Sequence, residues 1–210
     1  MAHVVWDWNG TLLADLDVSV DAVNVVMKAF GRNAITAEDY ARHYERPVRR
    51  FYEHLLDGPL DEPTWARVNE LWHDHYHRHL EAIPLAQDAI ETLERIADDG
   101  HTQSLLSMWM HDRLVAECER RKITKWFTRI DGDMTRDGGR KKISLAEHVA
   151  SLEDTAVANI VVIGDTIDDA EAAHAVGARA VLITATTHPD RLDGAGALLI
   201  NGLAELAAHL

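Results

Sequence analysis

Polar side chains suited to binding a cation or a phosphate group follow two short apolar runs of this chain. Residues 7–11, with the sequence Asp-Trp-Asn-Gly-Thr, come directly after the run at residues 3–6. Residues 164–169, with the sequence Gly-Asp-Thr-Ile-Asp-Asp, come directly after the run at residues 159–163. The second group has three carboxylates within five residues. These repel one another unless a cation or a helix N-terminus neutralises them, so the pattern indicates a cation site or an acidic helix start.

Each group also has a purely structural interpretation. Residues 7–11 can form an Asx turn that joins two elements, and this alternative stays open. Residues 164–169 can start a helix with Thr166 or Asp165 as its N-cap, which accounts for one or two of the acids. It does not explain why Asp165 stands at the very end of an apolar run. A third polar position, Ser107, closes another apolar run, and its hydroxyl can donate to a phosphate oxygen or cap a helix.

Apolar spacing predicts the elements that hold these residues in place. The near-continuous apolar run at residues 159–163 is typical of a strand buried on both faces of a parallel sheet. The predicted strands are residues 3–6, 102–106, 159–163, 180–183 and 198–200. The predicted helices between and after them are residues 90–99, 113–121, 145–152, 169–176 and 203–210. This alternation indicates a parallel sheet, at whose carboxyl edge ligands bind.

A long helical stretch separates the first strand from the rest of this pattern. Between about residues 17 and 80, apolar residues recur at helical spacing, and we predict no strand there. We therefore predict an α/β fold, a Rossmann-like three-layer sandwich with a parallel sheet and a small all-helical cap domain inserted after the first strand. The catalytic core is predicted at residues 1–15 and 82–210, and the cap at residues 16–81.

Composition limits the classes of protein that this chain can belong to. A formal net charge of −14 argues against a general nucleic-acid or membrane binder, so neither is an expected partner. It also means that a site for an anionic substrate needs local positive charge. The single cysteine, Cys118, cannot form an internal disulfide, and no signal peptide or membrane-length apolar run is visible. We therefore expect a cytoplasmic protein, and the oligomeric state is not predicted.

Together with a lysine ahead of the second acidic group, these segments resemble the four-part pattern of the haloacid dehalogenase-like (HAD) hydrolase superfamily. The four parts are residues 7–11, Ser107, Lys141 or Lys142, and residues 164–169. The resemblance extends over essentially the whole chain, and the position of the helical cap is similar to that in the phosphoglycolate phosphatase-like branch. It implies a Mg²⁺-dependent phosphatase that acts on a small phosphorylated metabolite through an aspartyl-phosphate intermediate.

The resemblance also implies a role for each matching residue. Asp7 is the expected nucleophile, and Asp169, or its neighbour Asp168, is expected to hold waters of the Mg²⁺ ion. The predicted metal ligands are Asp7, the main-chain carbonyl of Asn9, Asp165 and Asp169. The predicted catalytic residues are Asp7, Asn9, Ser107 and one of the pair Lys141 and Lys142, between which the sequence does not choose. The predicted substrate-binding residues are Gly10, Thr11, Arg46 and Arg49.

Asn9 departs from the pattern of the family. Phosphatases of this family usually have a second aspartate at this position, where it serves as general acid and base. An amide cannot protonate a leaving alkoxide, and general acid–base catalysis contributes about 10²–10⁴-fold. Three hypotheses follow: a preference for good leaving groups such as acyl or aryl phosphates, a proton donor from the cap, or a catalytically weak phospho-ligand-binding or regulatory protein.

Two charged groups in the predicted cap have alternative interpretations. Arg46, Arg49 and Arg50 concentrate positive charge that can clamp an anionic substrate, although a solvated helix face is the plainer interpretation. The four histidines between His73 and His79 form pairs at i, i+4 spacing. Such pairs can bind a metal ion, but a polar helix face is the preferred interpretation.

Overall fold

The computed structural model describes residues 1–134, 141–152, 155–184 and 186–210, without the side chains of residues 142 and 143. The chain divides into two compact units. The larger unit comprises Met1–Leu13 and Leu85–Leu210, and the smaller unit comprises Ala14–Pro84. Among the described helices, none has the length and apolar character needed to cross a membrane.

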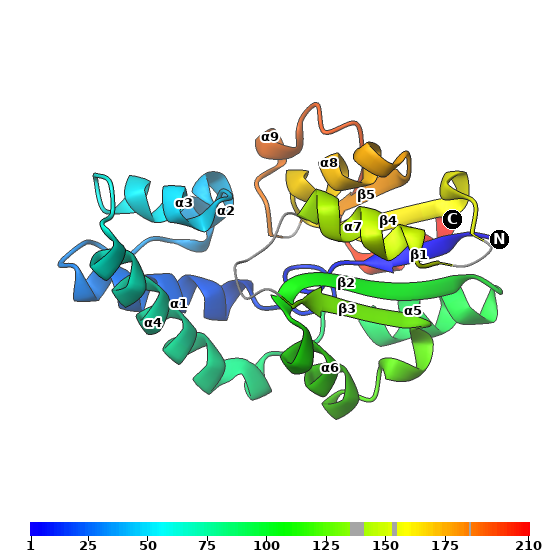
Figure 1. The fold of residues 1–210 in the computed structure, drawn as a ribbon, viewed down its shortest axis with the longest axis horizontal. Coiled ribbons are helices and arrows are strands. Elements are labelled where there is room, and N and C mark those ends of the chain that lie inside the picture. The colour runs from blue at the N-terminus through cyan, green and yellow to red at the C-terminus, as the bar shows by residue number, and fades with distance from the viewer. Residues whose placement is uncertain (135–140, 153–154, 185) are drawn as a thin grey trace. The chain divides into compact units, whose positions relative to one another are not determined.

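The larger unit is built on a sheet whose described strands all run parallel, in the order β3-β2-β1-β4-β5-β6 (Figure 1). The strands are β1 (His3–Trp6), β2 (Thr102–Met110), β3 (Arg129–Asp133), β4 (Ile160–Gly164), β5 (Arg179–Ile183) and β6 (Leu198–Ile200). The strand order reverses between β1 and β4. In sheets of this kind ligands bind outside the carboxyl ends of the strands at such a reversal.

Helices cover both faces of this sheet, which confirms the predicted α/β fold with a parallel sheet. Figure 1 shows α7 and α8 on one face and α5 and α6 on the other. The helices of this unit are α5 (Ala89–Asp98), α6 (His111–Arg120), α7 (Lys141–Ala150), α8 (Ile167–Val176) and α9 (Pro189–Leu192), with short 3-10 helices at Thr124–Trp126, Val157–Asn159 and Leu203–His209. The last of these replaces the α-helix that the sequence predicts at residues 203–210.

The amino-acid composition of the two central strands, β1 and β4, explains why they form there. Every residue of β1 and β4 is buried, and both strands are rich in β-branched side chains. Their side chains alternate between the two faces. Val5 and Val162 pack with Leu145 of α7 and Ala173 of α8 in one apolar cluster. The indole Nε1–H of Trp6, on the opposite face, donates to Gln103 (3.0 Å).

Strand β3 is an element that the sequence analysis does not predict. Its sequence, Arg-Ile-Asp-Gly-Asp, contains one apolar residue, Ile130, so it has neither an apolar run nor a clear alternation. It lies at the edge of the sheet, where charged side chains are common because they discourage pairing with another chain. A polar edge strand therefore escapes a pattern based on burial.

Strand β2 extends further than predicted. The predicted strand covers residues 102–106 and is closed by Ser107, but the observed strand continues to Met110. Its pairing with β3 shifts between Leu106 and Met110, so the ladder is irregular in this stretch. Within it, the Ser107 Oγ accepts the Trp109 N–H (3.1 Å). Ser107 therefore lies inside an irregular part of the strand and does not close it.

Every regular element described in the smaller unit is a helix. These are α1 (Leu16–Ala29), α2 (Ala37–His43), α3 (Val48–Leu55) and α4 (Glu62–His79), followed by a 3-10 helix at Leu80–Ala82. An aromatic and aliphatic cluster that includes Val26, Phe51 and Val68 forms their common core. The buried hydroxyl of Tyr76 donates to Asp15 (2.7 Å) and joins the end of α4 to the start of α1.

Candidate active site

The two polar groups of the sequence come together because the strands that precede them are neighbours. Trp6 lies opposite Ile163 in the parallel pairing of β1 and β4. The pairing continues one residue beyond β1, where the Asp7 N–H donates to the Ile163 carbonyl (2.8 Å). Asp7 and Asp165 therefore leave the carboxyl edge of the sheet side by side, at the point where the strand order reverses.

Three buried carboxylates converge at this edge. Oxygens of Asp7, Asp165 and Asp169 lie within 4.8 Å of one another, and we call these three residues the acidic cluster. Asp169 comes from the first turn of α8, where its Oδ2 accepts hydrogen bonds from the N–H (3.1 Å) and the hydroxyl (2.6 Å) of Thr166. One carboxylate thus both caps a helix and joins the cluster. Asp168, its neighbour, is half-buried and is not part of the cluster.

Among the described residues, the cation that contacts this cluster is Lys141, the first residue of α7. Its Nζ donates to Asp7 Oδ1 (2.6 Å) and forms an ion pair with Asp169 Oδ1. Its side chain is 11% exposed. Of the two predicted lysines, Lys141 therefore reaches the site, and the side chain of Lys142 lies outside the described part of the chain.

The charges of the cluster are not balanced by the protein groups that the structure describes. Burial raises the pKa of Asp7 to about 6, although Lys141 opposes this effect. Burial, followed by the charges of Asp169 and Asp7, raises the pKa of Asp165 well above its ordinary value. Burial also acts to raise the pKa of Asp169, but Lys141 and Thr166 outweigh it and lower that pKa. When all three carboxylates are ionised, the ammonium of Lys141 offsets one negative charge, and the described part of the chain leaves the other two unpaired.

The donor set of the cluster fits a hard divalent cation. Mg²⁺ prefers carboxylate and carbonyl oxygens together with water, and the acidic cluster offers carboxylate oxygens from three residues. A charge of +2 would also balance the negative charge that Lys141 leaves over. The acidic cluster is the one group of three or more such ligands found in the described residues.

Two glycines allow the strand ends to approach each other. Gly10 has a φ of +73°, and a Cβ atom added to it would lie 2.4 Å from Asp165 Oδ2. A Cβ atom added to Gly164 would lie 2.1 Å from the carboxyl carbon of Asp169. Any side chain at either position would displace a carboxylate of the cluster. Gly10, predicted to bind substrate, thus has a clear structural role in bringing residues 7–11 against Asp165.

The other residues of the first group have different environments. The side chain of Thr11 is fully buried, and its Oγ1 has no hydrogen-bond partner among the described residues. It presents no surface to a substrate in this structure. Asn9 is half-buried beside the cluster's nucleophile candidate, Asp7. Trp8 is fully buried, and the guanidinium of Arg121 lies over its ring, 5.9 Å from the centroid.

Thr186 belongs to the site, although the sequence analysis does not include it. Its hydroxyl donates to Asp165 Oδ2 in a short hydrogen bond. Thr186 follows β5, so it comes from the same carboxyl edge of the sheet as the acids. The sequence does hold an indication of this residue, because several threonines follow the predicted strand at residues 180–183.

The predicted arginines lie in the smaller unit and are described within it. The Arg49 guanidinium pairs with Glu62 (2.6 Å) and Glu53 (3.6 Å) and donates to the Leu60 carbonyl. This arginine is therefore already engaged by carboxylates of its own unit. The role of Arg46 and Arg49 in substrate binding stays a prediction.

The histidines of α4 pair as their spacing predicts. The ring centroids of His73 and His77 lie 5.4 Å apart, and those of His75 and His79 lie 4.3 Å apart. Among the described residues these rings do not belong to a group of three or more candidate metal ligands. The interpretation of this segment as a polar helix face is retained.

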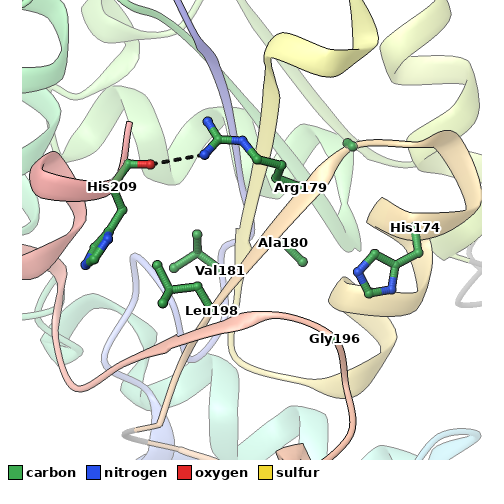
Figure 2. Close-up of a pocket in the computed structure, with 8 residues that line it drawn as sticks. His174, Arg179, Ala180, Val181, Gly196, Leu198 and His209 are labelled. Carbon is green, nitrogen blue, oxygen red and sulfur yellow. Dashed lines mark hydrogen bonds between the residues drawn. The ribbon is translucent and has the colours of Figure 1, made fainter.

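A separate hollow of about 390 Å³ lies elsewhere on the larger unit. Figure 2 shows Arg179 and Leu198 beside it, with His174 and His209 on opposite sides. Arg179 and Leu198 are the first residues of β5 and β6, so the hollow lies at the amino ends of these strands. The acidic cluster follows the carboxyl ends, and the hollow is therefore not part of the candidate site.

Comparison with known proteins agrees with this geometry. Residues 4–183 match the family model described as haloacid dehalogenase-like hydrolase. We found no curated protein whose sequence matches this chain.

Solved structures resemble the chain over nearly its full length. A predicted phosphatase from Clostridium acetobutylicum has a TM-score of 0.81 at 18% identity, and the match covers 99% of this chain and 96% of that one. A predicted phosphoglycolate phosphatase from Haemophilus somnus has a TM-score of 0.79 at 14% identity, covering 99% and 97%. A haloacid dehalogenase-like protein from Streptococcus pneumoniae has a TM-score of 0.80 at 15% identity, covering 100% and 98%. At these identities the likeness is one of fold.

Proposed function

The chain belongs to the haloacid dehalogenase-like hydrolase family, and we propose that it is a Mg²⁺-dependent phosphatase that acts on a small phosphorylated metabolite. The observation that carries this proposal is the acidic cluster of Asp7, Asp165 and Asp169 with the ammonium of Lys141 among its carboxylates. A buried cluster with excess negative charge is costly to a fold, so a ligand that balances it is the simplest explanation for its presence.

In the proposed reaction Asp7 is the nucleophile. One of its carboxylate oxygens forms a bond to phosphorus while the bond from phosphorus to the leaving oxygen breaks, which yields an aspartyl-phosphate. Water then attacks this intermediate, releases inorganic phosphate and restores the carboxylate. Lys141 donates to Asp7 in the structure, and in the reaction its ammonium would hold a phosphoryl oxygen beside that carboxylate.

Mg²⁺ would be held by the Asp7 carboxylate, the main-chain carbonyl of Asn9 and Asp165, with Asp169 holding its waters. When bound, the ion would neutralise charge on the phosphoryl oxygens and draw the like-charged phosphate and carboxylate together. Thr166 orients Asp169, and Thr186 orients Asp165, through the hydrogen bonds that each donates. Ser107 is proposed as a second donor to the phosphoryl group.

Asn9 is expected to restrict the range of substrates. Its amide cannot give a proton to a leaving alkoxide, whereas acyl and aryl phosphates need little protonation of the leaving group. We therefore propose that the enzyme prefers such substrates. Within this proposal the smaller unit acts as the cap that selects the substrate, and a charge reversal at Arg46 should raise KM if this arginine contacts the substrate.

A panel of phosphate esters and acyl phosphates tests the proposal. The native protein should hydrolyse acyl and aryl phosphates in the presence of Mg²⁺, and Asp7→Asn should abolish this turnover. Asn9→Asp should extend activity to alkyl phosphates by supplying the acid. Equal native rates for all leaving groups would contradict the proposed preference, and turnover that survives Asp7→Asn would contradict the proposed nucleophile.

A phospho-ligand-binding or regulatory protein is the second candidate, because Asn9 removes a catalytic group and leaves the acidic cluster in place. In that case the native protein would bind Mg²⁺ and hydrolyse no member of the panel, and activity would arise only in Asn9→Asp. The same panel therefore separates the two functions.

A further inference from the structure

A chain of hydrogen-bonded polar side chains crosses the interior of the larger unit, away from the acidic cluster. Asp131 Oδ2 lies 2.7 Å from His148 Nδ1, and His148 Nε2 lies 2.7 Å from Ser104 Oγ. The same Ser104 Oγ lies 2.7 Å from His3 Nε2, and His3 Nδ1 lies 2.7 Å from Thr102 Oγ1. His3, Ser104 and His148 are all buried. We call these five residues the polar chain.

The chemistry of the donors and acceptors assigns every proton in the polar chain. Arg129 and His148 outweigh the effect of burial and lower the pKa of Asp131, so this carboxylate is ionised and only accepts. The His148 Nδ1–H must then donate to it, which leaves His148 Nε2 as the acceptor of the Ser104 hydroxyl. The Ser104 oxygen in turn accepts from the His3 Nε2–H, and His3 Nδ1 accepts from the Thr102 hydroxyl.

This assignment needs both imidazoles to be neutral, and their surroundings make them so. Burial, together with the nearby His148, lowers the pKa of His3 to about 4. Burial also lowers the pKa of His148, although Asp131 opposes the effect. With both rings neutral, every polar atom in the sequence of contacts from Asp131 to Thr102 has a partner of the right kind. Such a network holds one geometry in place because any displacement leaves a buried group unpaired.

An Asp-His-Ser order of contacts also occurs in enzymes that use a serine nucleophile, but the surroundings exclude that role here. Ser104 is fully buried, and its Oγ is held between two imidazoles. No substrate can reach it without unfolding the sheet around it. The polar chain therefore acts on the structure and not directly on a substrate.

The polar chain ties together the three elements that carry the proposed catalytic groups. His3 begins β1, which Asp7 directly follows, Ser104 shares β2 with Ser107, and His148 shares α7 with Lys141. Lys141 and His148 are seven residues apart, so they lie about 10 Å apart along the helix axis. The helix α7 is thus held at its first turn by the acidic cluster and near its last turn by Ser104 and Asp131.

We propose that the polar chain is a positioning network, in which His148 and Ser104 fix α7 against the sheet and so hold Lys141 beside Asp7. The expected effect on the rate rests on the proposed function, whereas the expected effect on the attachment of α7 does not. Loss of the shared hydroxyl should loosen the C-terminal attachment of α7 and let Lys141 move relative to the carboxylates. A displacement of about 1 Å at such a group is enough to lower a rate by up to about 100-fold.

Ser104→Ala tests the network against Val162→Ala as a matched control. Val162 of β4 is buried in the apolar cluster with Val5 and Leu145. Its side chain has no polar atom, so truncating it loosens the core without removing a hydrogen bond of the polar chain. Hydrogen exchange of the α7 amides should be at least about tenfold faster in Ser104→Ala than in Val162→Ala. The kcat for acetyl phosphate should fall about 10- to 100-fold in Ser104→Ala only.

Asp131 provides a second test if Ser104→Ala fails to fold, because this residue is partly exposed. Asp131→Asn keeps an acceptor for the His148 Nδ1–H and should behave like the native protein, whereas Asp131→Ala should reproduce the effects of Ser104→Ala. Nitrogen-15 spectra of the native protein should show an Nδ1–H tautomer for His148 and an Nε2–H tautomer for His3.

Equal α7 exchange and equal kcat in Ser104→Ala and Val162→Ala, or a different tautomer at either histidine, would overturn the inference. If the native protein shows no Mg²⁺-dependent turnover, the proposed function fails, while exchange and tautomers still decide whether the network positions α7.

Discussion

The acidic cluster and the polar chain both bury titratable side chains in the larger unit, but they differ in how their charges and hydrogen bonds are balanced. In the polar chain each donor meets an acceptor, and the two imidazoles are held neutral. In the acidic cluster, carboxylates face one another with Lys141 as the cation between them, and two of them have raised pKa values. A balanced network stabilises a fold, whereas an unbalanced one indicates a site built for a ligand.

Asp165→Asn should separate activity from stability most strongly. The substitution removes a proposed metal ligand, so Mg²⁺-dependent turnover should fall by at least about 10³-fold. The same change relieves repulsion among buried carboxylates, so the metal-free protein at pH 8 should gain about 1 kcal/mol of unfolding free energy. Rate assays and urea unfolding in a chelator measure the two effects. A variant that loses both activity and stability would show that the cluster is a structural feature.

Lys141→Met should have the opposite effect on stability. It removes the ammonium that pairs with Asp7 and Asp169 and leaves their carboxylates buried without a cation. The free energy of unfolding in a chelator should fall by about 3 kcal/mol. Because Mg²⁺ would supply the lost positive charge, adding it should recover more stability in Lys141→Met than in the native protein. An equal gain in both proteins would argue against a shared site.

The polar chain should make the protein sensitive to acid. The pKa of His3 is lowered to about 4 in the folded protein from 6.5 in the unfolded chain, so its contribution to stability is present above pH 6.5. It is lost as the pH falls from 6.5 towards 4, where the unfolded state binds the extra proton. The expected loss is about 3 kcal/mol. His3→Gln should show a shallower decline over this range in urea unfolding, and a decline as steep as that of the native protein would exclude His3 as the cause.

Thr186→Val should have the smallest effect of the four. It removes the hydroxyl that donates to Asp165 Oδ2 and leaves the volume of the side chain almost unchanged. Residues that orient metal ligands typically affect affinity by about tenfold, so the dissociation constant for Mg²⁺ in calorimetry should rise by about that factor. Thr186→Ser keeps the hydroxyl and should bind Mg²⁺ as the native protein does. Unchanged affinity in Thr186→Val would remove Thr186 from the site.

The parts of the fold that could be predicted from the sequence are those in which burial leaves a local pattern. The central strands were predicted because burial on both faces demands an apolar run, as in β1 and β4. The acids that follow them were found because a carboxylate at the end of such a run has no packing role. The edge strand β3 was missed because a strand at the edge tolerates charged residues.

Contacts between residues far apart in the chain account for most of the remainder. His3 and Ser104 meet only because β1 and β2 pair, and nothing near either residue in the sequence indicates the other. Lys141 and Lys142 could not be distinguished because neighbouring residues on a helix differ only in direction, which the packing of α7 decides. The continuation of β2 past Ser107 depends on an irregular pairing with β3, the strand that was itself missed.

The phosphoryl group itself provides the most direct test of the central claim that the acidic cluster is the site of phosphoryl transfer. The protein should be mixed with acetyl phosphate and Mg²⁺, quenched in acid during turnover and analysed by mass spectrometry of its peptides. We predict one added phosphoryl group on Asp7, which a chelator prevents and which is absent from Asp7→Asn. Two results would contradict the account: turnover with the phosphoryl group on a residue other than Asp7, or an added phosphoryl group in the Asp7→Asn variant.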